Sequence, residues 1–226
     1  TNQLVAAKVA PLEKFSTIYS GMDISDFIQA DSYRSSVRQE LGFSEDNIVV
    51  GKIARLFDLK GHEYLVTAAS EIIKTNPAIH FLLVGDGILR KQIETQIERA
   101  GLSEHFHFTG LVPPSQIPRY LAAMDILAHT SLREGLARAL PQALLARRPV
   151  VSFDIDGAKE VCIPGETGYL VAPRDIAALE NAILKLAESK SLREELGSRG
   201  QRMCETMYPH QIMTNQIRTL YEQLLA

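Results

Sequence analysis

From about residue 48 onward, short apolar runs alternate with longer amphipathic stretches, and few folds are compatible with this pattern. The apolar runs have the length and composition of strands that are covered on both faces. They are Ile48–Ala54, Ile79–Val84, His105–Phe108, Asp125–Ala128 and Pro149–Phe153. Because strands that alternate with helices form βα units, the sequence predicts a parallel sheet between two helical layers.

Between these runs, apolar residues recur at intervals of three and four, which is the spacing of helices with one buried face. The expected helices cover residues 61–75, 88–100, 115–123 and 135–147. Gly101 marks the end of the second helix as a C-terminal cap. Pro141 lies inside the fourth helix, where it removes one backbone hydrogen bond and predicts a bend.

An earlier unit precedes this region, and further helices follow it. Phe15–Tyr19 is expected to be a strand, and Asp31–Leu41 a helix closed by Gly42. Asp175 caps a helix that runs to about Glu188, and residues 191–226 are expected to form helices interrupted near Tyr208. The prediction is a three-layer, Rossmann-like α/β domain of roughly six or seven parallel strands, which binds ligands beyond the carboxyl ends of its strands.

Composition argues against a nucleic-acid-binding protein and against a membrane-spanning protein. The 226 residues carry a formal net charge of -3, which gives no global attraction to nucleic acid or to an anionic membrane. No apolar run reaches the ~20 residues of a membrane span, and the start at Thr1 lacks the features of a signal peptide. The missing initiator Met suggests a processed or cut chain. Cys162 and Cys204 are isolated in the sequence, so a reducing cytoplasm is the expected location.

Arg55 and Lys60 form the first candidate site. Arg55 follows the strand expected at 48–54, and Lys60 precedes Gly61 at the start of the next helix. A helix N-terminus offers unpaired N–H groups, and a guanidinium and an ammonium group both bind phosphate. The residues therefore predict an anion site, with solvated surface cations as the alternative.

Two other segments follow strands. Gly85 and Gly87 flank Asp86 and allow either close approach of a ligand or a structural turn. Arg90 stands where a dinucleotide fingerprint needs its third glycine, which disfavours a dehydrogenase. Glu134 and Gly135 open the helix expected at 135–147, so the carboxylate and the amides of Gly135 and Leu136 either face the same crevice or form an ordinary acidic helix start.

Metal binding is disfavoured. Asp154 and Asp156 form an Asp-x-Asp pattern, but three-residue patterns arise often by chance and aspartates are common in turns. The six histidines form no set with ligand spacing, and His62, beside the proposed phosphate helix, is expected at the surface.

The ordered motifs resemble the C-terminal domain of retaining GT-B glycosyltransferases of family 4, also called group 1. The resemblance spans most of the chain. The motifs that carry it are Tyr19–Asp23, Arg55 with Lys60–His62, Val84–Gly87, Phe108–Gly110, Ser131–Gly135, Arg148–Val151, Gly157 with Glu160, and Gly165–Val171.

The resemblance implies a role for each candidate residue. Arg55 and Lys60 would hold the diphosphate of a nucleotide-sugar, with Gly85 close to the ligand. Glu134, with the amides of Gly135 and Leu136, would contact the sugar. Gly110 and Leu111 would border the base. Gln142 stands where the family has a second glutamate that accepts hydrogen bonds from the ribose, and Ala137 replaces a common Pro or Gly. We therefore expect weaker donor binding than with glutamate, by about 1 kcal/mol.

The resemblance also implies domains and partners. Residues 1–23 would be a linker-like segment with a first strand, 24–207 the nucleotide-sugar-binding domain, and 208–226 a helix crossing toward an N-terminal acceptor domain that this chain lacks. The donor would be a UDP- or GDP-sugar bound without a metal or other cofactor. The acceptor would be a saccharide or a lipid-linked sugar in cell-envelope polysaccharide or lipopolysaccharide synthesis. Peripheral membrane association of the full-length enzyme stays open. The alternative is a non-catalytic sugar-nucleotide-binding module.

Overall fold

A computed structural model describes residues 2–135 and 137–225. The chain divides into two compact units. The larger unit is Ser25–Cys204, and the smaller one combines the segment up to Ile24 with the segment from Glu205 onward.

The sheet belongs to the larger unit. In the described part of the chain it has six strands in the order β3–β2–β1–β4–β5–β6, and every neighbouring pair is parallel. The strands are β1 (Ile48–Ile53), β2 (Ile79–Val84), β3 (Phe106–Gly110), β4 (Ile126–His129), β5 (Val150–Phe153) and β6 (Gly168–Val171). The expected α/β architecture with a parallel sheet is therefore confirmed. Strands β1 to β5 lie in the five predicted apolar runs, and β6 is the sixth strand.

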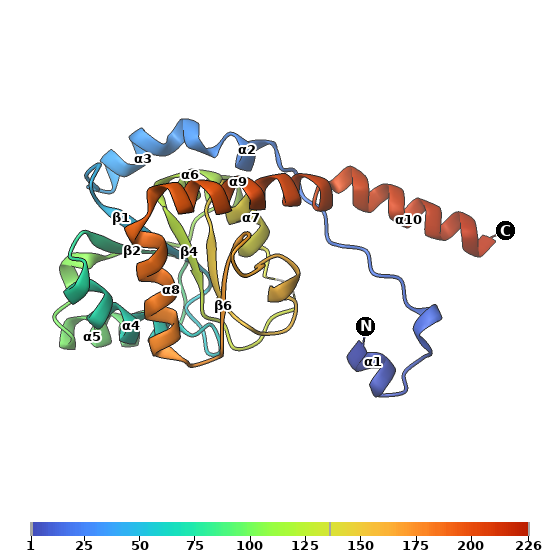
Figure 1. Cartoon of the computed structure of the whole chain (residues 1–226), viewed down its shortest axis with the longest axis horizontal. Coiled ribbons are helices and arrows are strands. Elements are labelled where there is room, and N and C mark those ends of the chain that lie inside the picture. Colours follow the sequence, from blue (N-terminus) through green and yellow to red (C-terminus); the bar gives the residue numbers. More distant parts are fainter. Residues whose placement is uncertain (1, 136, 226) are drawn as a thin grey trace. The chain divides into compact units, whose positions relative to one another are not determined.

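Helices cover both faces of this sheet. The α-helices are α1 (Asn2–Ala6), α2 (Ser25–Ile28), α3 (Arg34–Glu40), α4 (His62–Thr75), α5 (Arg90–Arg99), α6 (Ile117–Ala123), α7 (Ala139–Leu145), α8 (Ile176–Glu188), α9 (Lys190–Met207) and α10 (His210–Leu225). Short 3-10 turns are η1 (Leu12–Lys14), η2 (Ala30–Tyr33), η3 (Ser103–His105), η4 (Pro114–Gln116) and η5 (Ala158–Glu160). One layer contains α4, α5 and α8, and the other contains α3, α6 and α7 (Figure 1).

The helix ends follow the local sequence. Gly42 and Gly101, with φ of 75° and 70°, follow α3 and α5 in the left-handed conformation that ends many helices. The Asp175 carboxylate accepts a hydrogen bond of 2.9 Å from the Ala178 amide at the start of α8. The helix expected at 135–147 begins only at Ala139, so Pro141 lies in its first turn. The predicted loss of a hydrogen bond was wrong, because first-turn amides have no partner within a helix.

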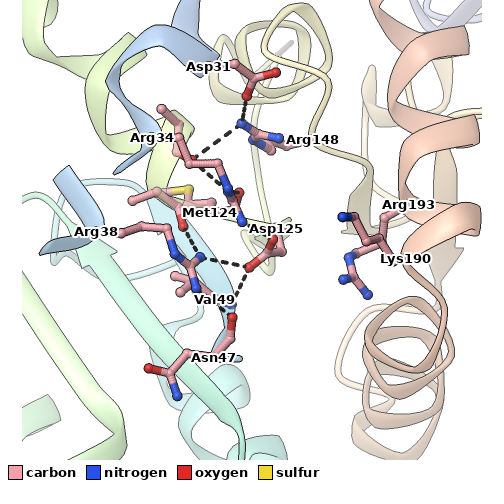
Figure 2. A network of polar contacts seen from close by, with 12 residues as sticks. Asp31, Arg34, Arg38, Asn47, Val49, Met124, Asp125, Arg148, Lys190 and Arg193 are labelled. Atoms are coloured by element: carbon pink, nitrogen blue, oxygen red, sulfur yellow. Dashed lines mark hydrogen bonds and ion pairs between the residues drawn. The ribbon is translucent and has the colours of Figure 1, made fainter. Parts of the chain in front are cut away.

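Polar contacts join the elements at the amino edge of the sheet (Figure 2). The Asp125 carboxylate accepts hydrogen bonds from Arg34 at 2.6 Å, from Arg38 at 3.2 Å and from the Val49 amide at 2.8 Å. Arg148 pairs with Asp31 at the same edge. A cavity of about 720 Å³ opens beside this network, and most of its lining residues are charged.

In the smaller unit, the two terminal segments meet. The Met22 amide donates to the Tyr208 carbonyl at 2.8 Å, and the His210 amide donates to the Met22 carbonyl at 3.0 Å. Phe15–Tyr19 belongs to no strand, so that expectation was wrong. A β-rich sequence becomes a strand only where a neighbour completes its ladder, and this segment joins none of the described strands.

Among the described helices, none is both long and apolar enough to cross a bilayer.

Candidate functional site

The strand order places two predicted site segments side by side. β1 pairs with β2 on one side and β4 on the other, so the chain changes direction across the sheet between β1 and β4. In open α/β sheets, the carboxyl edge at such a switch point is where ligands bind. Lys60 lies in the loop that follows β1, and Glu134 lies in the loop that follows β4.

Lys60 and Glu134 contact each other directly. The Lys60 Nζ donates to the Glu134 Oε1, and the two side chains are 20% and 22% exposed. An ammonium group and a carboxylate thus stand together at the carboxyl edge, within reach of solvent. One can bind an anion and the other a hydroxyl group, so the pair suits a ligand that carries both.

Further contacts fix the loops that carry this pair. The Leu132 amide donates to the Leu59 carbonyl at 2.8 Å, and the Thr130 hydroxyl donates to the Gly61 carbonyl at 2.6 Å. Gly61 is the N-cap of α4 and has a φ of 66°. A methyl group there would lie 1.9 Å from the Thr130 carbonyl oxygen, so only glycine allows this approach.

The loop after β5 supports the Glu134 segment from its other side. The Glu134 amide donates to Asp156 Oδ2 at 2.7 Å, and the Gly157 amide donates to the Gly135 carbonyl at 3.0 Å. The Asp156 carboxylate therefore accepts a hydrogen bond from the backbone of the Glu134 loop. Across residues 2–135 and 137–225, no group of three or more His, Cys, Asp or Glu residues is arranged to hold a metal ion.

The loop after β2 packs against the Arg55 segment. The Gly85 amide donates to the Gly110 carbonyl at 3.1 Å, and a methyl group on Gly85 would lie 2.1 Å from the Ala54 carbonyl oxygen. Gly85 is thus needed for loop packing, as the turn interpretation expects. Arg55 itself is exposed, with its guanidinium 4.9 Å from the centre of the Phe57 ring.

The remaining predicted residues lie in other loops and on α7. Gly110 ends β3 with a φ of 71°, and the following Leu111 is 82% exposed. Gln142 is partly buried on α7. Gly135 precedes α7 by four positions instead of starting it, and Leu136 lies outside the described residues.

The family model of the glycosyl transferases group 1 matches residues 34–203, which include the sheet and all the loops described above. The chain belongs to this family.

Individual relatives and solved structures are also similar to this chain. The 2-deoxystreptamine glucosyltransferase of Streptomyces kanamyceticus is 31% identical over 144 residues, which is 64% of this chain and 37% of that protein. HepE of Anabaena, solved in complex with UDP and glucose, is 30% identical with a TM-score of 0.87, covering 98% of this chain and 60% of that one. The C-terminal domain of the group 1 protein LpcC from Francisella tularensis shares the fold, with 22% identity, a TM-score of 0.71, and coverage of 78% of this chain and 93% of that one.

The chain spans 37% to 50% of the length of three curated relatives that it matches. It therefore matches one part of each of these relatives.

The sequence of this group 1 chain did not reveal a buried polar cluster beneath the two loops. Lys52, His62, His129, Thr130 and Ser131 are all buried. The expectation of a surface position for His62 was wrong, since it is 2% exposed. The one available signal was Lys52 itself, a lysine inside an otherwise apolar strand.

Burial shifts the pKa values of this cluster. It lowers the pKa of Lys52 to about 7 and the pKa of His62 to about 2. It also lowers the pKa of His129 to about 3. The nearby Lys60 lowers all three further. At neutral pH both histidines are therefore uncharged, whereas Lys52 exists in both protonation states.

Proposed function

We propose that this chain is the donor-binding domain of a retaining glycosyltransferase. It would help to move a hexosyl group from a UDP- or GDP-linked donor to a saccharide or lipid-linked acceptor, in the synthesis of cell-envelope polysaccharide or lipopolysaccharide. The observation that carries the proposal is the pairing of Lys60 with Glu134 at the switch point of a group 1 domain.

The chemistry of the pair fits a nucleotide-sugar. As the bond to the sugar breaks, the leaving diphosphate gains negative charge, and Lys60 and Arg55 stabilise that charge without a metal. Glu134 accepts hydrogen bonds from sugar hydroxyls next to the phosphate. Since Lys60 and Glu134 are bonded to each other here, donor binding would exchange this ion pair for contacts with phosphate and sugar.

The neighbours favour a uridine nucleotide as the first one to test. HepE of Anabaena is known in complex with UDP-glucose, and it is 29% identical to this chain with a TM-score of 0.88. An N-terminal domain in the longer protein would supply the acceptor site. Such a partner would place the site in a cleft between two domains.

The experiment is calorimetric titration with UDP, GDP and ADP, each with magnesium and with EDTA. Lys60→Ala and Arg55→Ala should weaken binding of the preferred diphosphate about tenfold or more, because each removes a charged hydrogen bond to phosphate. Binding of the free nucleoside should change little. Lys74→Ala is the matched control, since it removes the same charge from the last turn of α4, the helix that follows Lys60.

Equal weakening of nucleoside and diphosphate would refute the phosphate assignment. Loss of binding in EDTA would refute the metal-free mechanism.

Gln142 favours a second candidate function, a non-catalytic sugar-nucleotide-binding module. Its neutral amide has one acceptor oxygen for a ribose that a carboxylate would bind with two. Sugar transfer by this chain, or by a longer protein that contained it, would decide against that candidate.

A further inference from the structure

A continuous chain of buried hydrogen bonds runs from β1 to the start of α4. Lys52 in β1 is 1% exposed, and its Nζ donates to Thr130 Oγ1 at 2.9 Å. The Thr130 hydroxyl in turn donates to the Gly61 carbonyl at 2.6 Å. Because the hydroxyl donates to the carbonyl, its lone pairs are left to accept from Lys52, so the direction of the chain is fixed.

The end of this chain is next to the Lys60–Glu134 pair. Gly61 follows Lys60 directly and is the N-cap of α4, so the position of its carbonyl sets where the Lys60 side chain and the first amides of α4 point. The Gly61 backbone also packs against the Thr130 carbonyl. A shift of Thr130 would therefore move both the cation and the helix N-terminus.

Burying Lys52 in this way does not favour the stability of the fold. A lysine inside a buried strand loses its hydration, and an apolar side chain of similar volume would fill the same space without that cost. Beside it, the side-chain nitrogens of His62, Nε2 of His129 and Oγ of Ser131 are buried without a hydrogen-bond partner among the described residues. Such departures from ordinary core composition concentrate at functional sites.

We infer that Lys52 and Thr130 are positioning residues of the donor diphosphate site: through the Gly61 carbonyl they set the direction in which Lys60 and the first amides of α4 meet the phosphates. This inference rests on the proposed function. It gives Lys52 a role through Thr130 and Gly61, not through contact with the donor.

The same geometry predicts how binding depends on pH. The charged groups that act on Lys52 are Glu63 on α4, Lys60 in the loop after β1 and Glu134 in the loop after β4. A diphosphate bound beside Lys60 adds negative charge near Lys52, which favours its protonated form. Since the pKa of Lys52 lies at about 7, affinity should fall as the pH rises through neutrality. His62 and His129 stay uncharged over this range and do not contribute.

The test compares three variants by titration with UDP, GDP and ADP between pH 6 and 8. Lys52→Met keeps the length of the side chain and removes the amine. It should unfold at the same or a higher urea concentration than the wild type, bind the preferred diphosphate about tenfold more weakly at pH 6.5, and lose the pH dependence. Thr130→Val removes the hydroxyl at constant shape and should weaken binding several-fold, whereas Thr130→Ser keeps the hydroxyl and should bind nearly as the wild type.

Three results would overturn the inference. The first is wild-type affinity and pH profile in Lys52→Met. The second is equal affinity of Thr130→Val and Thr130→Ser, a comparison that holds even if Lys52→Met does not fold. The third is an equal loss for diphosphate and free nucleoside, which indicates general damage. If the wild type bound none of the three diphosphates, the proposed function would fail together with this inference; wild-type binding with unaffected variants would refute the inference alone.

Discussion

At the scale of single residues, the Asp125 carboxylate joins Arg34, Arg38 and the Val49 amide at the amino edge of the sheet. Its side chain is 11% exposed and faces Arg38, whose side chain is 6% exposed. Asp125→Ala should lower the free energy of unfolding by about 3–5 kcal/mol, because it leaves Arg38 buried without its counter-charge. Urea denaturation measures this loss. Glu195→Ala, which breaks an exposed pair with Arg199 on α9, should cost less than about 1 kcal/mol. Similar losses in both variants would contradict the burial argument.

A second prediction at the scale of single residues concerns Gln142 and the affinity for the diphosphate. Gln142→Glu should tighten diphosphate binding several-fold, since a carboxylate accepts two charged hydrogen bonds from the ribose. Calorimetry measures the change, and Gln39→Glu, at an exposed position on α3, is the control with the same added charge. Unchanged affinity would show that position 142 does not face the ribose.

The sequence predicts single site residues only in part. Lys60 and Glu134 were proposed as site residues because each lies in a motif after a strand, and the structure brings them into contact. Lys52 and His62 were missed because their burial depends on Thr130 and its neighbours, 78 positions from Lys52. No local pattern reports a contact of that range.

At the scale of elements, the start of α4 depends on Gly61. Gly61→Ala adds a methyl group at a φ of 66° and within 1.9 Å of the Thr130 carbonyl oxygen. Gly42→Ala has the same backbone strain, with φ of 75°, but nothing within 4 Å of the added methyl group. The control should lose about 1 kcal/mol of stability. Gly61→Ala should lose more and should also bind diphosphate more weakly. Urea unfolding and calorimetry compare the two, and equal effects would mean that the contact with Thr130 is unimportant.

Elements were predictable where a continuous apolar run determines them. β1 and β2 match their runs closely, because strands covered on both faces need apolar side chains throughout. The start of α7 was placed four residues too early, since Glu134 and Gly135 are held before the helix by Asp156 and Gly157. Loops of this kind depend on contacts from another part of the chain.

At the scale of the whole molecule, the partly buried His80 makes stability depend on pH. Burial lowers the pKa of His80 to about 4, with His105 and His107 lowering it further. In the unfolded chain a histidine takes up its proton below about pH 6.5. The stability contributed by the neutral His80 ring is therefore present above about pH 6.5 and is lost as the pH falls toward 4.

Replacing His80 tests how much this ring contributes to the pH dependence of stability. His80→Gln should lose less stability than the wild type between pH 7.5 and 4.5, by about 1 kcal/mol, an amount reduced because the ring is partly exposed. Urea unfolding at four pH values provides the comparison. Parallel losses in the two proteins would exclude His80 as a source of the pH dependence.

The strand order also means that the two neighbours of β1, which are β2 and β4, leave the ribosome at different times. Strands β1 to β3 come from one continuous stretch, whereas β4 joins β1 at a seam where Val49 and Asp125 are 76 positions apart. At about 5–20 residues per second, the β4 side of β1 waits roughly 4–15 s for its partner. During that interval an apolar strand edge is open to other nascent chains. The seam that holds the Lys60 and Glu134 loops together in the finished protein is thus where a growing chain is most exposed to aggregation.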